Sequence, residues 1–271
     1  MSDTIAETGP PGAALRGILV RLVAGVRHDI DALPARADER VHNIRVGMKK
    51  FRAVLRLAGA ILPQKSLMRA DKLARQLKEH FASTRDNDVL RALLRDLLGN
   101  REASETAESL GLTAASSGTG AVMDPVAVEI CSSLAGFAEG LNLDALRGRE
   151  VRAAWVYTYR AARRAMKHCV ENKEDDGLFH EWRKRVKELL YQSAILAVIP
   201  AAEAIARRAQ DLSSALGAHH DLAVLCERLA QRLPGSHAEK AARARKDDFV
   251  RRALEIGGEL FAAKPSRLRS P

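Results

Sequence analysis

The sequence predicts an all-α protein, and three observations carry that prediction. Apolar residues recur every three or four positions along most of the chain, which is the repeat of a helix that packs on one face. Ala, Leu and Arg fill the positions between them, and all three favour helices. No stretch shows the period-two alternation of a strand, and aromatic residues make up only 4% of the chain.

The helices are placed in chain order, and their ends are set by loss of the apolar repeat and by proline. Pro63 and Pro200 each stand where a long helix should stop, because proline lacks the amide hydrogen that an interior helical bond requires. The predicted helices are 12–29, 37–62, 66–82, 87–98, 101–110, 124–140, 149–171, 178–198, 201–216, 221–232 and 237–262. Residues 1–11 are predicted to be a disordered N-terminus and residues 263–271 a C-terminal tail.

The stretch GLTAASSGTGA, residues 111–121, is predicted to be a flexible linker because Gly, Ser and Thr dominate it. It divides the helical region 12–262 into halves of about 12–110 and 122–262. A shift of 138 residues places His42, Arg45 and Lys49 on His180, Arg183 and Lys187, and a shift of 135 places RDNDVL (85–90) on HDLAVL (220–225). We therefore expect an internal duplication that forms two pseudo-symmetric helical bundles.

A row of cations without any acid marks the stretch 41–57. At about 100° per residue, Arg45, Lys49, Arg52 and Arg56 fall within about 80° on one side of His42. Apolar positions border this row on both sides, so we expect it to line a cleft between packed helices and not an exposed face of mixed charge. Like charges placed in this way repel one another until a polyanion or an acidic partner offsets them.

The second copy keeps the apolar side of this helix but has a shorter cationic row. Leu190 and Ala194 stand at the positions of Arg52 and Arg56, while Lys184 adds a charge nearby. A further basic run precedes this copy, with Glu150 as its only acid: Arg147, Arg149, Arg152, Arg160, Arg163, Arg164 and Lys167.

Composition points to an anionic partner. Lys and Arg number 44 against 34 Asp and Glu, a formal charge of +10, and the isoelectric point is about 9.8; such a balance suits nucleic acid, an acidic membrane surface or another polyanion. The three cysteines are far apart, so no disulfide framework is expected. No uncharged apolar run of about 18 residues is found, so we expect a cytoplasmic protein without a membrane span.

The paired motifs resemble the CHAD family, α-helical domains named for their histidines. The resemblance rests on His-x-x-Arg-x-x-x-Lys within VHNIRVGMKKFRAVLRL (41–57) and FHEWRKRVKELLYQ (179–192), together with RDNDVL and HDLAVL. It covers roughly residues 12–262 and implies two helical bundles whose basic helices face a shared groove. Family members bind inorganic polyphosphate, and some associate with polyphosphate granules. The contacts that it implies fall on His42, Arg45, Lys49, Lys50, Arg52, His180, Arg183, Lys184 and Lys187.

Arg56 and the later basic run add five more candidates, which are Arg56, Arg160, Arg163, Arg164 and Lys167. Two positions depart from the family pattern, because Leu190 stands where a base is usual and Glu188 stands opposite Lys50.

A linear polyphosphate suits these rows physically. A helical turn rises about 5.4 Å, so one row presents a cation on nearly every turn, and both Arg and Lys bind phosphate oxygens. Nucleic acid is the second candidate partner. With two Trp and three Tyr, none of them within the first row, a platform for base stacking is poorly supported.

Enzymatic alternatives have less support in the sequence. His219, His220 and Asp221 resemble the His-Asp pair of metal-dependent phosphohydrolases, but no further ligand set accompanies them, and Asp221 is also a candidate helix N-cap, as is Asp86. ERVH, residues 39–42, has the Glu-x-x-His spacing of di-iron bundles but occurs once. No phosphate-binding glycine loop is present. We expect no enzyme, no cofactor and no metal site.

The histidines that begin the two rows carry a separate expectation. Neighbouring cations disfavour an imidazolium, so we expect the pKa of His42 and of His180 to lie below about 6.5 without ligand. A bound polyanion would reverse the sign of the local field, and each ring would then take up a proton.

Overall fold

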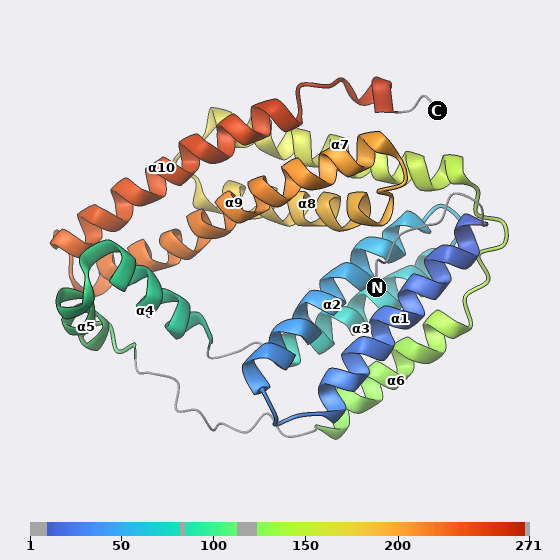
Figure 1. Cartoon of the computed structure of the whole chain (residues 1–271), viewed down its shortest axis with the longest axis horizontal. Helices are drawn as coiled ribbons and strands as arrows, with labels where there is room; N and C mark the ends of the chain where they lie inside the picture. The colour runs from blue at the N-terminus through green and yellow to red at the C-terminus, as the bar shows by residue number, and fades with distance from the viewer. Residues whose placement is uncertain (1–9, 82–84, 113–123, 269–271) are drawn as a thin grey trace.

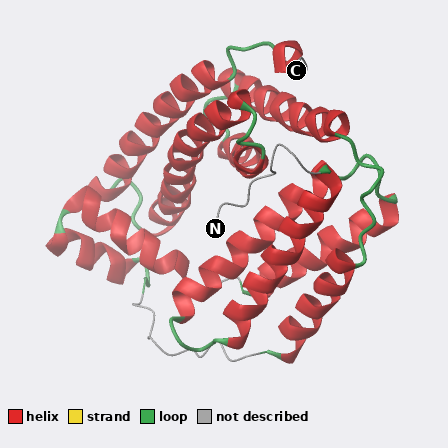
Figure 2. Cartoon of the chain, turned by 45° about the vertical axis from the view of Figure 1, so that its right-hand side comes forward, coloured by secondary structure: helices red, strands yellow, loops and turns green. Residues whose placement is uncertain are grey.

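The computed structural model describes residues 10–81, 85–112 and 124–268. Within these ranges every regular element is a helix, which confirms the all-α prediction (Figure 2). None of the described helices is long and apolar enough to cross a membrane. The elements are α1 (Pro11–Asp31), α2 (Ala37–Leu57), α3 (Gln64–His80), α4 (Arg85–Leu98), α5 (Asn100–Ser109), α6 (Pro125–Glu139), α7 (Gly148–Glu171), α8 (Asp176–Ile195), α9 (Pro200–Arg232), α10 (His237–Leu260) and the 3-10 turn η1 (Pro265–Leu268).

Polar side chains start several of these helices. The Asp124 carboxylate accepts a hydrogen bond from the Val126 amide at 2.7 Å, directly before Pro125 begins α6. Asp175 caps α8 in the same way, and the Ser236 hydroxyl accepts from the Glu239 amide at the start of α10. These side chains satisfy amide groups that have no partner inside the helix, which fixes where each helix begins.

Two groups of helices form the body of the protein (Figure 1). In the first group, α1 packs on α2 and α6, and α3 packs on α2 and α6. In the second group, α7, α8, α9 and α10 pack in sequence order, each on the next. Both groups contribute to one continuous core, in which Phe51, Trp155 and Trp182 are fully buried. The groups meet where α2 packs against α7 and α8.

A smaller core lies at one end of the second group. There α4 and α5 pack on each other, and α4 contacts α9 and α10 (left in Figure 1). Leu90 and Leu94 of α4 are buried against Leu225 and Leu229 of α9 and Ala242 of α10.

This packing crosses the boundary drawn from the sequence. Helix α6 follows the predicted linker 111–121, yet it packs with α1 and α3 of the first half; α4 and α5 precede the linker, yet α4 packs with α9 and α10. Gly111 and Leu112 are described, and Leu112 is buried in the smaller core; the rest of the linker lies outside the described residues. The bundles are therefore not two contiguous halves, and the internal duplication stays a prediction.

Three other expectations differ from the structure. The segments 201–216 and 221–232 form one continuous helix, α9, so Asp221 lies inside a helix and is not an N-cap. No proline separates the two segments, and Gly217 between them is tolerated. Helix α2 ends at Leu57, five residues early, in a turn that precedes Pro63. The predicted tail forms η1, and the Tyr159 hydroxyl lies 3.0 Å from the carbonyl oxygens of Leu260 and Ala263.

Candidate anion-binding site

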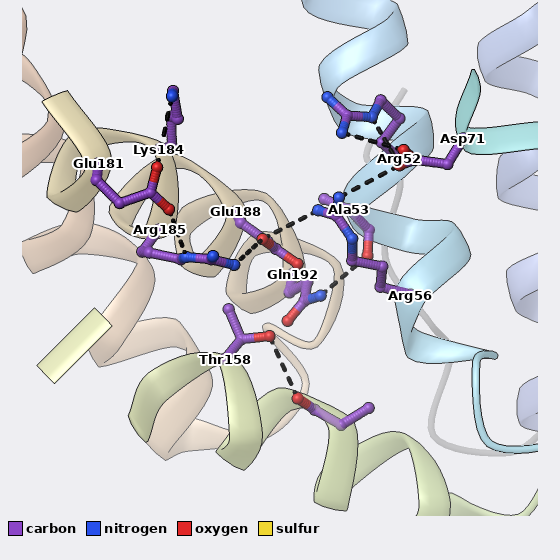
Figure 3. A network of polar contacts seen from close by, with 11 residues as sticks. Arg52, Ala53, Arg56, Asp71, Thr158, Glu181, Lys184, Arg185, Glu188 and Gln192 are labelled. Atoms are coloured by element: carbon purple, nitrogen blue, oxygen red, sulfur yellow. Dashed lines mark hydrogen bonds and ion pairs between the residues drawn. The ribbon is translucent and has the colours of Figure 1, made fainter. Parts of the chain in front are cut away.

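A buried hydrogen bond sets the two basic helices side by side. The Gln192 side chain of α8 is fully buried and donates from Nε2 to the Ala53 carbonyl oxygen of α2 at 3.0 Å (Figure 3). The apolar faces of both helices are buried in the main core, with Met48 and Phe51 on α2 and Val186 and Leu189 on α8. The rows that begin at His42 and His180 are therefore brought to one interface between helices distant in sequence.

Four cations gather at this interface. Arg45 and Lys49 come from α2, and Arg183 and Lys187 come from α8. Burial first, and then the charges of Arg183, Arg45 and Lys78, lower the pKa of Lys49 to about 8. Burial, followed by the charges of Arg183 and Lys49, likewise lowers the pKa of Lys187 to about 8. We call Arg45, Lys49, Arg183 and Lys187 the cationic cluster.

The cluster has little internal compensation. Within the described part of the chain, Arg45, Lys49 and Lys187 make no ion pair. Among the described residues, Asp221 of α9 is an acid whose charge opposes the lowering of the pKa at Arg183 and Lys187. In the part of the chain that the structure describes, these two half-buried amines and two guanidinium groups thus have one carboxylate that acts on them, which leaves an excess of positive charge that an anion would offset.

Arg183 is partly buried between α8 and α9. Burial lowers the pKa of this side chain, and its Nε is buried without a hydrogen-bond partner among the described residues. The guanidinium lies over Gly217 of α9, where an added Cβ would be 3.8 Å from Nη2. An arginine cannot lose its proton at ordinary pH, so this buried donor stays charged and has no acceptor among the described residues.

The last two arginines of the cationic row on α2 are paired with acidic side chains. Arg52 donates to Asp71 at 2.8 Å, and Arg56 contacts Asp71 at 3.2 Å and Glu188 at 3.0 Å (Figure 3). Although burial acts to raise it, hydrogen bonding to Arg52 and the nearby Arg charges hold the pKa of Asp71 below its ordinary value. Arg52 and Arg56 therefore link α2 to α3 and α8, and less of their charge faces an incoming anion.

The other predicted residues lie around the cluster or away from it. Lys50 is half-buried on α2, and Lys184 is exposed on α8, 3.4 Å from Glu181. On α7, Arg163 donates to the Phe261 carbonyl oxygen at 3.0 Å and so ties this helix to the end of α10. Three further α7 residues have no contact in the described structure that joins them to the cluster: Arg160, Arg164 and Lys167.

The two histidines differ in environment. His42 is exposed on α2. His180 is half-buried, its ring centroid is 4.5 Å from that of His220, and its buried Nδ1 has no hydrogen-bond partner among the described residues. Burial, followed by the charges of His220, Lys184 and Arg183, lowers the pKa of His180 to about 4. The expected direction is confirmed for His180, but burial and not the neighbouring cations is the largest cause.

The side chains of the HHD triplet face three different neighbours. His219 is buried against the Phe179 ring, and its Nε2 is 3.2 Å from Asp176, which also binds Lys246. His220 faces His180, and Asp221 acts on Arg183 and Lys187. Successive residues of one helix point about 100° apart, so the continuity of α9 separates them. Among the described residues, no group of three His, Cys, Asp or Glu is placed to hold a metal ion.

Comparison with known proteins bears on the family. The family model for the CHAD domain matches residues 17–230. The chain belongs to the CHAD domain family. The crystal structure of the CHAD domain from the plant Ricinus communis matches this CHAD domain with a TM-score of 0.61 and 16% identity, over 97% of this chain and 96% of that one. That likeness supports the fold. No curated protein matches the sequence.

Sequence reasoning missed two contributors to the site in this CHAD domain. Lys78 of α3 acts on Lys49, and Tyr191 of α8 acts on Arg183. Neither is a cation of the rows that begin with histidine. The role of Lys78 depends on how α3 packs beside the cluster, whereas Tyr191 follows Lys187 by four residues and lies on the same side of α8. Asp221 was recognised in the sequence as a candidate helix cap and as a candidate metal ligand, but not as an acid beside the cations.

Proposed function

We propose that this CHAD domain binds inorganic polyphosphate at the cationic cluster. One observation carries the proposal: Arg45, Lys49, Arg183 and Lys187 converge from two helices with no ion pair at Arg45, Lys49 or Lys187 in the described structure, while the pKa of both lysines falls to about 8. A pKa below the ordinary value means that the environment disfavours the charged amine, and the charge of a bound polyanion offsets that penalty.

The chemistry of the cluster suits phosphate more than a base. Guanidinium groups donate to two phosphate oxygens at once, and ammonium groups act as compact point charges. The described surroundings of the cluster provide helix side chains and one tyrosine, Tyr191, which is itself half-buried. A groove that guides a linear polyanion along α2 and α8, and association of the protein with polyphosphate granules, are parts of this proposal.

Matched charge removal tests where binding occurs. Arg45→Gln with Lys49→Gln should weaken polyphosphate binding at least about tenfold, since each lost contact to a charged group contributes about 1.5–3 kcal/mol. Arg251→Gln with Arg252→Gln removes the same formal charge from exposed positions of α10 and should change the affinity less than about twofold. Equal losses in the two variants would show that the overall charge, and not the cluster, controls binding.

Competition separates polyphosphate from nucleic acid. Fluorescently labelled polyphosphate is displaced by unlabelled polyphosphate or by duplex DNA at equal phosphate concentration. The proposal expects polyphosphate to compete at a concentration at least about tenfold lower. Equal or better competition by DNA would favour a nucleic-acid partner. In cells, a fluorescent fusion should gather on polyphosphate granules, and the Arg45→Gln, Lys49→Gln variant should not.

A further inference from the structure

The side of α7 that faces away from its neighbouring helices carries cations without acids. Helix α7 packs on α2, α8 and α10, and Trp155, Tyr159 and Ala162 on its packed side are buried. At about 100° per residue, four side chains fall within about 80° of one another on the opposite side, which are Tyr157, Arg160, Arg164 and Lys167. No Asp or Glu occurs between Glu150 and Glu171. This side of the helix therefore carries one sign of charge.

The end of the chain after α10 adds positive charge beside it. The Tyr159 hydroxyl lies 3.0 Å from the Ala263 carbonyl oxygen, and η1 packs on α7 with Leu268 buried in the main core. These contacts hold Lys264 and Arg267, both exposed, next to α7. We call Tyr157, Arg160, Arg164, Lys167, Lys264 and Arg267 the α7 patch.

The α7 patch differs from an ordinary solvated helix face, which carries both signs of charge. Exposed arginines on α5 and α9 each form an ion pair with a glutamate four residues away. Across residues 10–81, 85–112 and 124–268, none of the five cations of the patch has an ion pair. Like charges on one surface repel one another, and an anionic partner offsets that repulsion.

Tyr157 indicates which anion fits the patch. The residue is 64% exposed, and it lies about one turn before Arg160 on the same side of α7. An exposed ring beside cations stacks on a nucleobase while the cations bind the neighbouring phosphates. Polyphosphate offers no ring for this contact. The apolar neighbours on this side, Ala153 and Ala161, are small, so the patch presents no large apolar stripe that would enter a membrane surface.

We propose that the α7 patch binds single-stranded nucleic acid, with a base stacked on Tyr157 and phosphates on the cations. From Tyr157 to Lys167 the patch extends about 15 Å along the helix, which a few nucleotides cover. In a duplex each base stacks between its neighbours, so its face is closed to the ring. The patch lies on the side of α7 opposite α8 and the cationic cluster, and this inference does not rest on the proposed function.

Fluorescence anisotropy of a labelled oligothymidylate of about 12 nucleotides tests the stacking contact in the full chain. Tyr157→Ala should weaken binding about fivefold to a hundredfold, because stacking on an aromatic side chain contributes that much for each base. Tyr157→Phe keeps the ring and should stay within about twofold of the parent. A duplex of equal phosphate content should bind at least about fivefold more weakly than the single strand and should respond to neither substitution.

Matched charge removal locates the bound strand. Arg164→Gln with Lys167→Gln should weaken binding of the oligothymidylate at least about tenfold. It should also reduce the slope of log affinity against log salt by about 1.4, since each phosphate contact on a single strand contributes about 0.7. Arg45→Gln with Lys49→Gln removes the same formal charge from the cationic cluster and should change the affinity less than about twofold. Circular dichroism checks the fold of each variant.

Three results would overturn the proposal: no binding of the oligothymidylate by the parent, parental affinity in Tyr157→Ala, or equal losses in the two charge variants. The first uses the unaltered protein, so misfolding of a variant cannot explain it. Phosphatidylserine vesicles and polyglutamate are the probes for a membrane and for an acidic protein. A greater dependence of either probe on Tyr157 and Arg164 would assign the patch to that partner and refute the nucleic-acid assignment.

Discussion

Raising the pH from 7 to 9 should weaken polyphosphate binding between about tenfold and a hundredfold. In the free protein the pKa of Lys49 and of Lys187 is about 8, so both amines are mostly charged at pH 7 and mostly neutral at pH 9. A bound polyanion shifts each pKa back toward the ordinary value, so binding takes up protons. Each lysine then contributes a loss of about tenfold over this range, or about 1.4 kcal/mol.

Isothermal titration calorimetry checks this expectation. The dissociation constant is measured at pH 7, 8 and 9, and buffers of different ionisation enthalpy report the number of protons taken up. The matched variant is Lys49→Arg with Lys187→Arg, because arginine keeps its charge throughout this range. It should bind at pH 7 and lose most of the pH dependence. A parent protein with constant affinity from pH 7 to 9, or a variant with the same slope as the parent, would refute the reasoning.

The same lysines have the opposite effect on the stability of the free protein. Their folded-state pKa lies below the value expected for an unfolded chain, so the unfolded state binds more protons between about pH 8 and 10. The free energy of unfolding should therefore rise with pH in this window. Urea unfolding at pH 8 and pH 10, with the double arginine variant as control, measures the difference, and an identical response in both proteins would contradict the assigned pKa values.

The remaining predictions concern salt, the acidic contacts and the core. Polyphosphate affinity should fall steeply as salt is raised, because binding releases counterions; a flat salt response in a titration would exclude an electrostatic site. Arg52→Gln with Arg56→Gln should lower the free energy of unfolding by about 1–2 kcal/mol, since Asp71 loses two of its partners. This variant should weaken polyphosphate binding less than the Arg45, Lys49 variant does, and a larger effect on binding would assign the ligand to the distal row. Gly257→Ala should destabilise the protein by about 1–3 kcal/mol, because the new Cβ would be 2.7 Å from the Trp182 ring; an unchanged melting temperature would contradict this.

The sequence predicted the structure well wherever a feature depends on the geometry of a single helix. The apolar repeat located the helices, and the spacing of Arg45 and Lys49 placed them on one face of α2, as the structure shows. Angular position within a helix depends on local geometry alone. The same reasoning joined Arg183 and Lys187 on α8, and the repeated motif correctly singled out the two helices whose cations meet.

The sequence was less informative where contacts depend on other helices. Nothing in the spacing of the cations on α2 distinguishes Arg52 from Arg45. In the structure, Asp71 of α3 and Glu188 of α8 bind the distal arginines of that row. They do not pair with the proximal cations, Arg45 and Lys49. The assignment of α6 to the second bundle failed for the same reason, because an amphipathic helix does not specify which partner covers it. A turn was expected before Asp221, but the tertiary packing of α9 keeps it helical.

The place of α6 in the fold has a consequence for synthesis on the ribosome. Helices α1, α2 and α3 are complete when His80 has been made, but α6 is still missing from their bundle. In the folded protein, Ala127, Cys131 and Leu134 of α6 are buried in the shared core. About 60 further residues must follow, which takes about 3 to 12 s at ordinary elongation rates. During this interval the nascent chain exposes the apolar faces of α1 and α3, so we expect a chaperone to bind it until α6 has left the exit tunnel.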